Sequence, residues 1–283
     1  MPRTVPPQDN AALTAPNTLT APAPPAGLPA RFGFRSGERG THASRSIMLA
    51  DLDQLFTATP ATATHTDYHA AIQDENVLGK RTASTRLWSW KKLRELYGLD
   101  PRLAVFRCFR QLWEFDSAGR PLLAVLCACA RDPLLRTSAA LILQTPLGSA
   151  LGSADFAQAM AQAAPDRFSP QTLEAMGIRL AASWTQSGHL AGGKTRQRAH
   201  PVLSPEAAVY ALLLGRLAGA RGQLLFSTFW TALLDAPTEA VYDLAAVASQ
   251  RGRIDLRRVG SVVDVGFPRL LTPEEEVALR ESS

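Results

Sequence analysis

Proline and glycine residues cut most of this chain into segments of helix length, and this punctuation restricts its fold more than any other feature. Between Ser44 and about Ala164 the apolar residues recur at helical spacing, with few signs of strands. The interruptions fall at Pro60, around Gly79, at 98–101, at 119–121, at Pro133 and at Pro146. Asp100 followed by Pro101 is a typical N-cap and first-turn pair. We therefore predict a helical bundle for this half of the chain.

After Ser169 the pattern changes from helices alone to helices followed by hairpins. A helix from about Pro170 to Ser187 leads to Gly188, a glycine-rich turn and a basic extended stretch. Helices near 205–217, 225–234 and 238–250 then precede two short strands, at 253–256 and 261–265. A helix followed by a hairpin is the order found in winged-helix domains. The predicted fold class is mainly α, a helical bundle followed by winged-helix-like modules with short β-hairpins.

The same patterns divide the chain into five parts. Residues 1–30 hold eight prolines and almost no charge, a composition that cannot bury a core. The segment 31–41 is typical of a loop that leads into a helix starting near Ser44. We expect a disordered Pro/Ala-rich leader (1–31), a helical bundle (32–165), a winged-helix-like element (166–203), a second winged-helix-like module (204–271) and an acidic tail (272–283) of one or two frayed helical turns.

Composition limits the compartment and the class of partner. The 283 residues, 46% of them hydrophobic, are enough for two modest domains with proper cores. A net charge of +5 favours polyanionic partners. Three cysteines without C-x-x-C spacing indicate neither a disulfide framework nor a zinc site and fit the reducing cytoplasm. The most apolar run, 121–130, is ten residues long, whereas a membrane span needs about 20. We expect a cytoplasmic protein with no membrane partner.

Candidate catalytic motifs fail the tests of context that their chemistry requires. Residues 188–195 match the phosphate-loop pattern G-x-x-x-x-G-K-T, but that loop needs a strand before it and a helix after it, and the order here is reversed. His65 and His69 are four residues apart without the glutamate of H-E-x-x-H, so we interpret them as surface histidines. No nucleophile elbow or pair of carboxylates is evident. We expect no catalysis, cofactor, metal or small-molecule substrate.

Positive charge is concentrated between residues 80 and 110, which hold nine Lys or Arg against two acids. On a helix from Ala83 to Tyr97, one side is expected to pack and the other to be cationic. The packed side carries Leu87, Trp90, Leu93 and Tyr97, and the opposite side carries Trp88, Lys91, Lys92 and Glu95. Arg86 falls on the packed side, which predicts a buried ion pair or a special role. Lys80, Arg81, Arg86, Lys91 and Lys92 are candidate nucleic-acid contacts, although a cationic helix face is often only a solvated one.

The helix from Pro170 is the candidate recognition helix. Its packed side carries Leu173, Met176, Leu180 and Trp184, and the other side offers Arg179 and Gln186 as donors to base edges. An ordinary surface helix would have a similar face. After it, Lys194, Arg196 and Arg198 alternate as on a wing strand, which would point three cations toward phosphates.

A second set of arginines lies at the equivalent place in the second module. Arg253, Arg257 and Arg258 surround a short strand. They are candidates for a second phosphate contact or for a protein interface, because fold alone does not decide between these uses.

Three runs of residues resemble the BrxA family of the bacterial BREX phage-defence systems. They are RSGERG at 35–40, ENVLGKRTASTR at 75–86 and LRELY at 93–97. More loosely, the similarity extends from about Phe32 to the C-terminal hairpin. The resemblance implies a small all-helical accessory protein, comparable with the NusB antitermination fold. It would act beside a methyltransferase, an ATPase and a phosphatase-like component without catalysis of its own.

These observations favour a non-enzymatic, DNA-binding accessory protein of a BREX-type complex, with double-stranded DNA and other BREX components as partners. Two alternatives stay open at this point. The chain could serve as a protein-interaction scaffold within that complex, or as a NusB-like RNA-binding factor.

Overall fold

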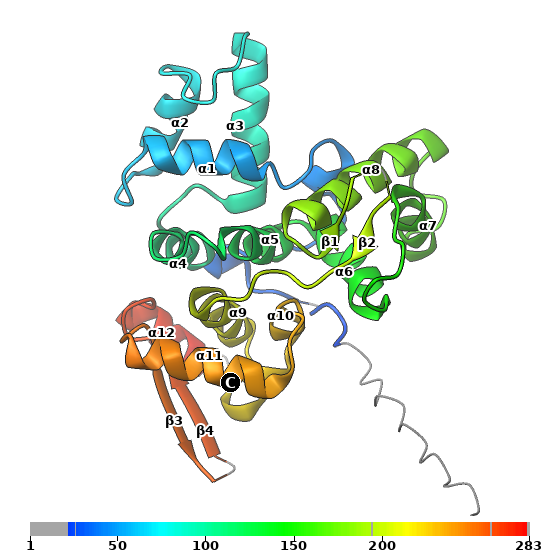
Figure 1. Cartoon of the computed structure of the whole chain (residues 1–283). Coiled ribbons are helices and arrows are strands. Elements are labelled where there is room, and N and C mark those ends of the chain that lie inside the picture. Colours follow the sequence, from blue (N-terminus) through cyan, green and yellow to red (C-terminus); the bar gives the residue numbers. More distant parts are fainter. Residues whose placement is uncertain (1–21, 26, 194, 261, 282–283) are drawn as a thin grey trace, which may run out of the picture.

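The protein is mainly helical, with two small antiparallel hairpins, as Figure 1 shows. The computed structural model describes residues 22–25, 27–193, 195–260 and 262–281. The fold class predicted from the sequence, mainly α with short hairpins, is confirmed. Across the described part of the chain, none of the helices combines the length and the hydropathy needed to cross a bilayer.

The first seven α-helices stop and start where proline and glycine interrupt the sequence pattern. Their bounds are α1 Leu49–Ala58, α2 His65–Gln73, α3 Ala83–Tyr97, α4 Ala104–Trp113, α5 Arg120–Arg131, α6 Pro133–Gln144 and α7 Ser153–Ala163. Two short 3₁₀ turns, η1 Ala30–Phe32 and η2 Thr41–Ala43, precede them. The helix expected near Ser44 begins five residues later, at Leu49, after Met48 in a left-handed conformation (φ 53°).

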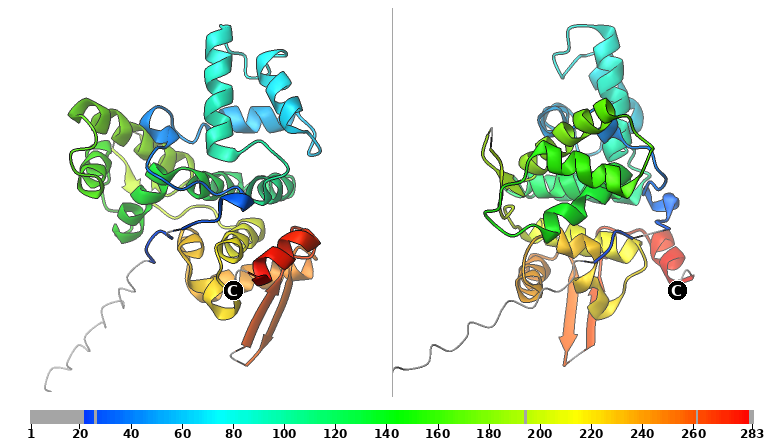
Figure 2. Two further views of the ribbon diagram at one scale, coloured as in Figure 1. Left: turned by 180° about the vertical axis from the view of Figure 1, so that it is seen from behind. Right: turned by 90° about the vertical axis from the view of Figure 1, so that its right-hand side faces the viewer.

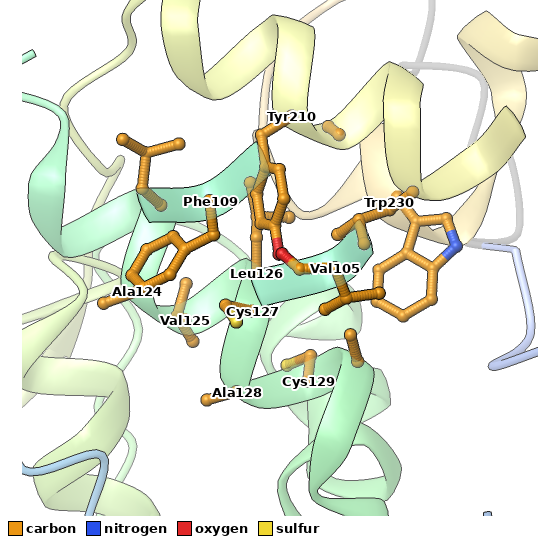
Figure 3. Close-up of a cluster of buried hydrophobic side chains, with 14 of the residues drawn as sticks. Val105, Phe109, Ala124, Val125, Leu126, Cys127, Ala128, Cys129, Tyr210 and Trp230 are labelled. Carbon is orange, nitrogen blue, oxygen red and sulfur yellow. The ribbon is translucent and has the colours of Figure 1, made fainter. Parts of the chain in front are cut away.

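Helix α5 lies at the centre of the molecule and contacts α3, α4, α6, α8 and α9. Every residue from Leu122 to Arg131 is buried, which explains why this run is the most apolar in the chain. Figure 3 shows its side chains beside Phe109 of α4 and Tyr210 of α9 (Pro205–Leu217), whose ring centroids lie 5.8 Å apart. The Tyr210 hydroxyl donates to the carbonyl of Val105 over 2.8 Å, so this buried phenol is satisfied.

The C-terminal third runs as α9, η3 Gly222–Ser227, α10 Phe229–Ala232, α11 Thr238–Gln250, β3 Asp255–Val259 and β4 Val262–Gly266. Helices followed by a hairpin are the order predicted for the second winged-helix module. Strand β4 packs on η3 and strand β3 on α11. Both views of Figure 2 show the hairpin extending beyond the helices.

Helix α8 Pro170–Gln186 precedes the smaller hairpin, β1 Leu190–Ala191 with β2 Gln197–Arg198. Two predictions at the chain ends need correction. The leader was expected to end at residue 31, but Leu28 is buried in the core; residues 1–21 and 26 of the leader lie outside the described residues. The acidic tail, predicted as one or two frayed turns, forms the helix α12 Pro273–Glu281. This helix is packed on the protein, because Leu279 is buried and Glu275 pairs with Arg107.

Candidate nucleic-acid interface

Helix α3 presents the cationic face that its sequence predicts. A capping box between Thr82 and Thr85 starts the helix, and Gly98 in a positive-φ conformation ends it. Lys91 is exposed, and Trp88 keeps 52% of its surface accessible. The ammonium groups of Lys91 and Lys92 lie 5.5 and 5.8 Å from the Trp88 ring centroid. A large aromatic surface beside two cations is therefore available to a ligand.

The packed side of α3 differs from the prediction at two positions. Trp90, Leu93 and Tyr97 are buried as expected, but Leu87 is 41% exposed. Arg86 is half-buried, forms no ion pair within the described residues, and its Nε has no hydrogen-bond partner there. Of the two alternatives predicted for Arg86, the buried ion pair is thus wrong, and the special role stays a prediction.

Carboxylates at the edge of α3 hold two of the predicted lysines in place. The Lys80 ammonium lies 2.7 Å from Asp51 of α1, and the Lys92 ammonium lies 2.8 Å from Glu95. Thr41 also donates to Glu95 over 2.8 Å. Burial acts to raise the pKa of Glu95, but Lys92 and Thr41 outweigh it, so this pKa is lowered and the side chain stays anionic. Arg81, by contrast, is exposed.

Arginines of the segment 35–46 lie beside these lysines, and sequence reasoning missed them. Two cavities follow each other along α3, each between that helix and this segment. One, of about 430 Å³, includes Arg45 and Lys80 in its lining; the other, of about 320 Å³, includes Arg39 and Lys92. We call the two together the α3 groove. Arg39 and Arg45 are exposed and have no acidic partner among the described residues.

Helix α8 contributes its last residue, Gln186, to the lining of the α3 groove, and both of its predicted base-reading residues contact the protein itself. Gln186 receives the Leu49 N–H (3.1 Å) and donates to Ser46 (3.2 Å), so its amide is used inside the protein. Arg179 is half-buried and donates to the carbonyl of Ala43 over 2.6 Å. The role of these two residues in reading bases stays a prediction; in this structure they donate to Ala43 and Ser46, in the segment beside α8.

A buried Ser–His–Asp chain anchors the floor of the α3 groove. His42 lies 2.9 Å from Asp132 through Nδ1 and 2.8 Å from the Ser183 hydroxyl through Nε2. All three side chains are buried, the Ser183 hydroxyl also donates to the carbonyl of Arg179, and Ile47 N–H donates to it. These contacts occupy the serine hydroxyl on all sides, so the chain has the distances of a catalytic triad without access for a substrate.

In the predicted wing after α8, the side chain of Arg198 points into the protein and that of Arg196 is half-buried. Arg198 is only 4% exposed and pairs with Asp235 at 2.7 Å, while Arg196 donates to Thr185 over 3.1 Å. Lys194 lies outside the described residues. The expectation that these cations form an exposed ridge is therefore wrong for Arg196 and Arg198.

The second hairpin has a mixed rather than a cationic environment. Arg253 is half-buried over the ring of Phe115 (3.5 Å) and near Glu206, and Arg258 lies over Tyr242 and 3.7 Å from Glu239. Arg257 is exposed, opposite Asp264 in the strand register. The exposed side of α11 carries Glu239 and Asp243, which would repel phosphates.

The remaining motifs adopt structural roles. Helix α8 precedes the phosphate-loop pattern, and the described residues from 187 to 204 form only the two short strands of the first hairpin. His65 and His69 flank Trp90 at 5.0 Å each, and no cluster of three metal-ligating side chains exists in the described part of the chain. The three cysteines are buried and free.

Comparisons with known proteins add no family. No protein-family model matches the chain, and no curated protein does. The assignment of the α3 groove as a candidate interface therefore depends on its geometry alone.

Proposed function

We propose that the protein binds double-stranded DNA in the α3 groove and acts as a non-enzymatic accessory protein. The observation that carries the proposal is the convergence of cations from separate parts of the sequence on one groove. Lys80 and Lys92 come from the edge of α3, and Arg39 and Arg45 come from the segment between η1 and α1. Arg39 and Arg45 form no salt bridge among the described residues, so their positive charges are available to a polyanion.

The dimensions of the groove fit a run of phosphates. The two cavities extend along α3 from Thr85 to Glu95, which corresponds to about 15 Å of helix at 1.5 Å per residue. One DNA strand places its phosphates about 3.4 Å apart along the duplex axis. A protein face of this length thus spans several phosphates, and contacts to phosphates fix position without reading sequence. We expect weak sequence preference.

Binding of duplex DNA across a salt series, followed by fluorescence anisotropy, tests the proposal. The groove variant carries Arg39→Ala and Arg45→Ala in the groove lining, together with Lys91→Ala on the exposed face of α3. All three are exposed cations with no ion pair among the described residues. Each lost phosphate contact lowers the slope of log K against log salt by about 0.9. We expect the triple variant to bind weakly, with a slope lower by about 2 to 3.

A matched control removes the same charge elsewhere. Arg102, Arg257 and Arg280 are exposed and lie away from the groove, and their replacement by Ala should leave the slope nearly unchanged. If the control variant loses as much affinity as the groove variant, the α3 groove is not the interface. Absence of binding at low salt refutes DNA binding, and stronger binding of duplex RNA in the same assay would replace DNA by RNA.

The resemblance of residues 35–97 to the BrxA family supplies a setting for this activity. In that setting the protein would be an accessory DNA-binding component of a BREX-type phage-defence complex. Co-purification of the chain with a methyltransferase or an ATPase of such a system would support this setting.

One observation favours the scaffold alternative for a different part of the molecule. Val259 and Val262, paired at the end of the β3–β4 hairpin, are 78% and 69% exposed, and the hairpin extends away from the helices. Exposed apolar side chains on a projecting element are typical of protein contacts. Retention of a purified partner at high salt by the wild type, but not by a Val259→Ser/Val262→Ser variant, would assign this function to the hairpin.

A further inference from the structure

One end of the α3 groove is a cavity whose lining is rich in unused hydrogen-bond donors. This cavity of about 430 Å³ lies between the start of α1, the start of α3 and the segment 45–48. Its volume is in the range of small-ligand sites. We refer to it as the α1 cavity.

The first turn of α1 supplies two of these donors. Met48 stands at the N-cap position, and its side chain forms no capping hydrogen bond. The Leu49 N–H is satisfied by Gln186, whereas the N–H groups of Ala50 and Asp51 have no acceptor among the described residues. All three residues line the cavity. The ten-residue helix thus directs unpaired N–H groups and the positive end of its dipole at this space.

Ser89 provides an independent indication of a ligand. Only 6% of the surface of Ser89 is exposed, and Ser89 is one of the residues that line the α1 cavity. Its hydroxyl has no hydrogen-bond partner within the described residues. The oxygen of this unpaired hydroxyl is not fully enclosed, so it can donate to an acceptor that enters the cavity from outside the chain.

Two cations complete the lining, and one carboxylate opposes them. Arg45 is exposed at the rim without an acidic partner in the described part of the chain. Lys80 uses one of its three ammonium protons on Asp51, over 2.7 Å. Two protons of Lys80 thus stay available to an acceptor. The cations exceed the carboxylate by one charge, and the dipole of α1 adds to that excess.

We propose that the α1 cavity binds a terminal phosphate group, a phosphate monoester, at the end of a nucleic-acid strand or on a free nucleotide. This inference rests on the proposed function, because the cavity is one end of the α3 groove. A backbone phosphodiester has two unbridged oxygens and one charge. A monoester has three such oxygens and nearly two charges at neutral pH, as phosphorylated side chains do. The number of donors in the α1 cavity matches the oxygens of a monoester better than those of a diester. These donors come from five residues: Ala50, Asp51, Ser89, Lys80 and Arg45.

The test compares three otherwise identical DNA duplexes with an internal fluorophore. One carries hydroxyl groups at all ends, one carries 5′-phosphates and one carries 3′-phosphates. We expect the wild type to bind a phosphorylated duplex roughly tenfold more tightly than the hydroxyl duplex, as a charge-assisted set of hydrogen bonds allows. In a parallel arm, adenosine 5′-monophosphate and inorganic phosphate are titrated by calorimetry.

Variants separate the cavity from the rest of the groove. Ser89→Ala removes a hydroxyl that has no protein partner, so folding should be unaffected, and the preference for phosphate ends should fall roughly fivefold. Arg45→Ala should abolish the preference. Lys91→Ala, outside the cavity lining, should weaken all three duplexes equally and leave their ratio unchanged.

The outcomes distinguish this inference from the proposed function. A preference for phosphorylated ends that Ser89→Ala reduces supports a strand end as the source. Binding of the nucleotide, sensitive to Ser89→Ala, with no end preference supports a free nucleotide as the source. Equal binding of all duplexes together with no binding of nucleotide or phosphate overturns the inference, although DNA binding stands. No binding of any duplex at low salt overturns the proposed function itself.

Discussion

Replacement of Asp132 should show how strongly the floor of the α3 groove is held. The two oxygens of this buried carboxylate have separate tasks. Oδ1 caps α6 by accepting from the N–H groups of Leu134 and Leu135 at 2.9 and 3.2 Å. Oδ2 accepts from the backbone N–H and the ring Nδ1 of His42 at 3.1 and 2.9 Å. One side chain therefore joins the start of a core helix to the segment that forms the groove floor.

The expected loss of folding stability follows from the burial of Asp132 and from the number of hydrogen bonds that it accepts. Removing one partner of a buried, hydrogen-bonded pair costs about 3–5 kcal/mol, and we expect this loss for Asp132→Ala. Asp132→Asn keeps an oxygen for the helix cap but turns an NH₂ group toward the His42 N–H, so a loss of about 2–4 kcal/mol is expected. Ser169→Ala, at the exposed N-cap of α8, serves as the control for capping alone and should cost about 1 kcal/mol. Urea unfolding followed by circular dichroism measures all three.

The pH dependence gives a second check on the same carboxylate. Burial acts to raise the pKa of Asp132, but His42 and the N–H groups that it accepts outweigh this, and the pKa lies below its ordinary value of 3.8. A lowered pKa stabilises the fold above pH 3.8, and this stabilisation is lost as the pH falls through the folded-state value. The difference between wild type and Asp132→Asn should shrink below pH 4. A loss under 1 kcal/mol at pH 7 for Asp132→Ala would refute the reasoning.

Three further predictions concern the core. A Cβ at Gly177 would lie 2.2 Å from a backbone oxygen of α7, so Gly177→Ala should cost about 1–3 kcal/mol in urea unfolding; Gly193→Ala, with no atom within 4 Å, should be neutral, and equal losses would contradict the packing argument. Burial raises the pKa of Cys108 and Cys127 to about 12, so a disulfide reagent at pH 8 should label these thiols only after unfolding, and rapid labelling of the native protein would show that they are accessible. Arg198→Ala should cost about 3–5 kcal/mol because it removes the buried guanidinium that pairs with Asp235 and donates to the carbonyls of Ile142 and Ala199; a melting temperature equal to that of the wild type would show that these buried contacts contribute nothing.

The sequence predicted the elements well because local chemistry determines where helices stop. Pro133 and the glycines at 98 and 119 fall at helix boundaries as expected, and α9 and α11 match their predicted bounds. The same local rules indicated a hairpin after α8 and another after α11. Both signals act within a few residues, so no knowledge of tertiary packing is needed to use them.

The orientation of the candidate site residues could not be predicted in this way. Alternation could not indicate that Arg198 is buried, because Asp235, 37 residues away, provides its partner. Conversely, Arg39 and Arg45 carry no periodic signal, because they lie in an irregular segment that only the packing of η2 brings beside α3. The cationic side of α3 was predicted because helical periodicity alone separates Lys91 from the packed residues.

The complete enclosure of α5 has a consequence for how the chain can vary. Most helices of a protein tolerate change along one stripe, so a systematic substitution scan shows tolerance that rises and falls every three to four positions. From Leu122 to Arg131 that rhythm should be absent, since each position is surrounded by neighbouring helices. Variation in this segment should be confined to side chains of matching volume, and a change at one position should require a compensating change in an adjoining helix.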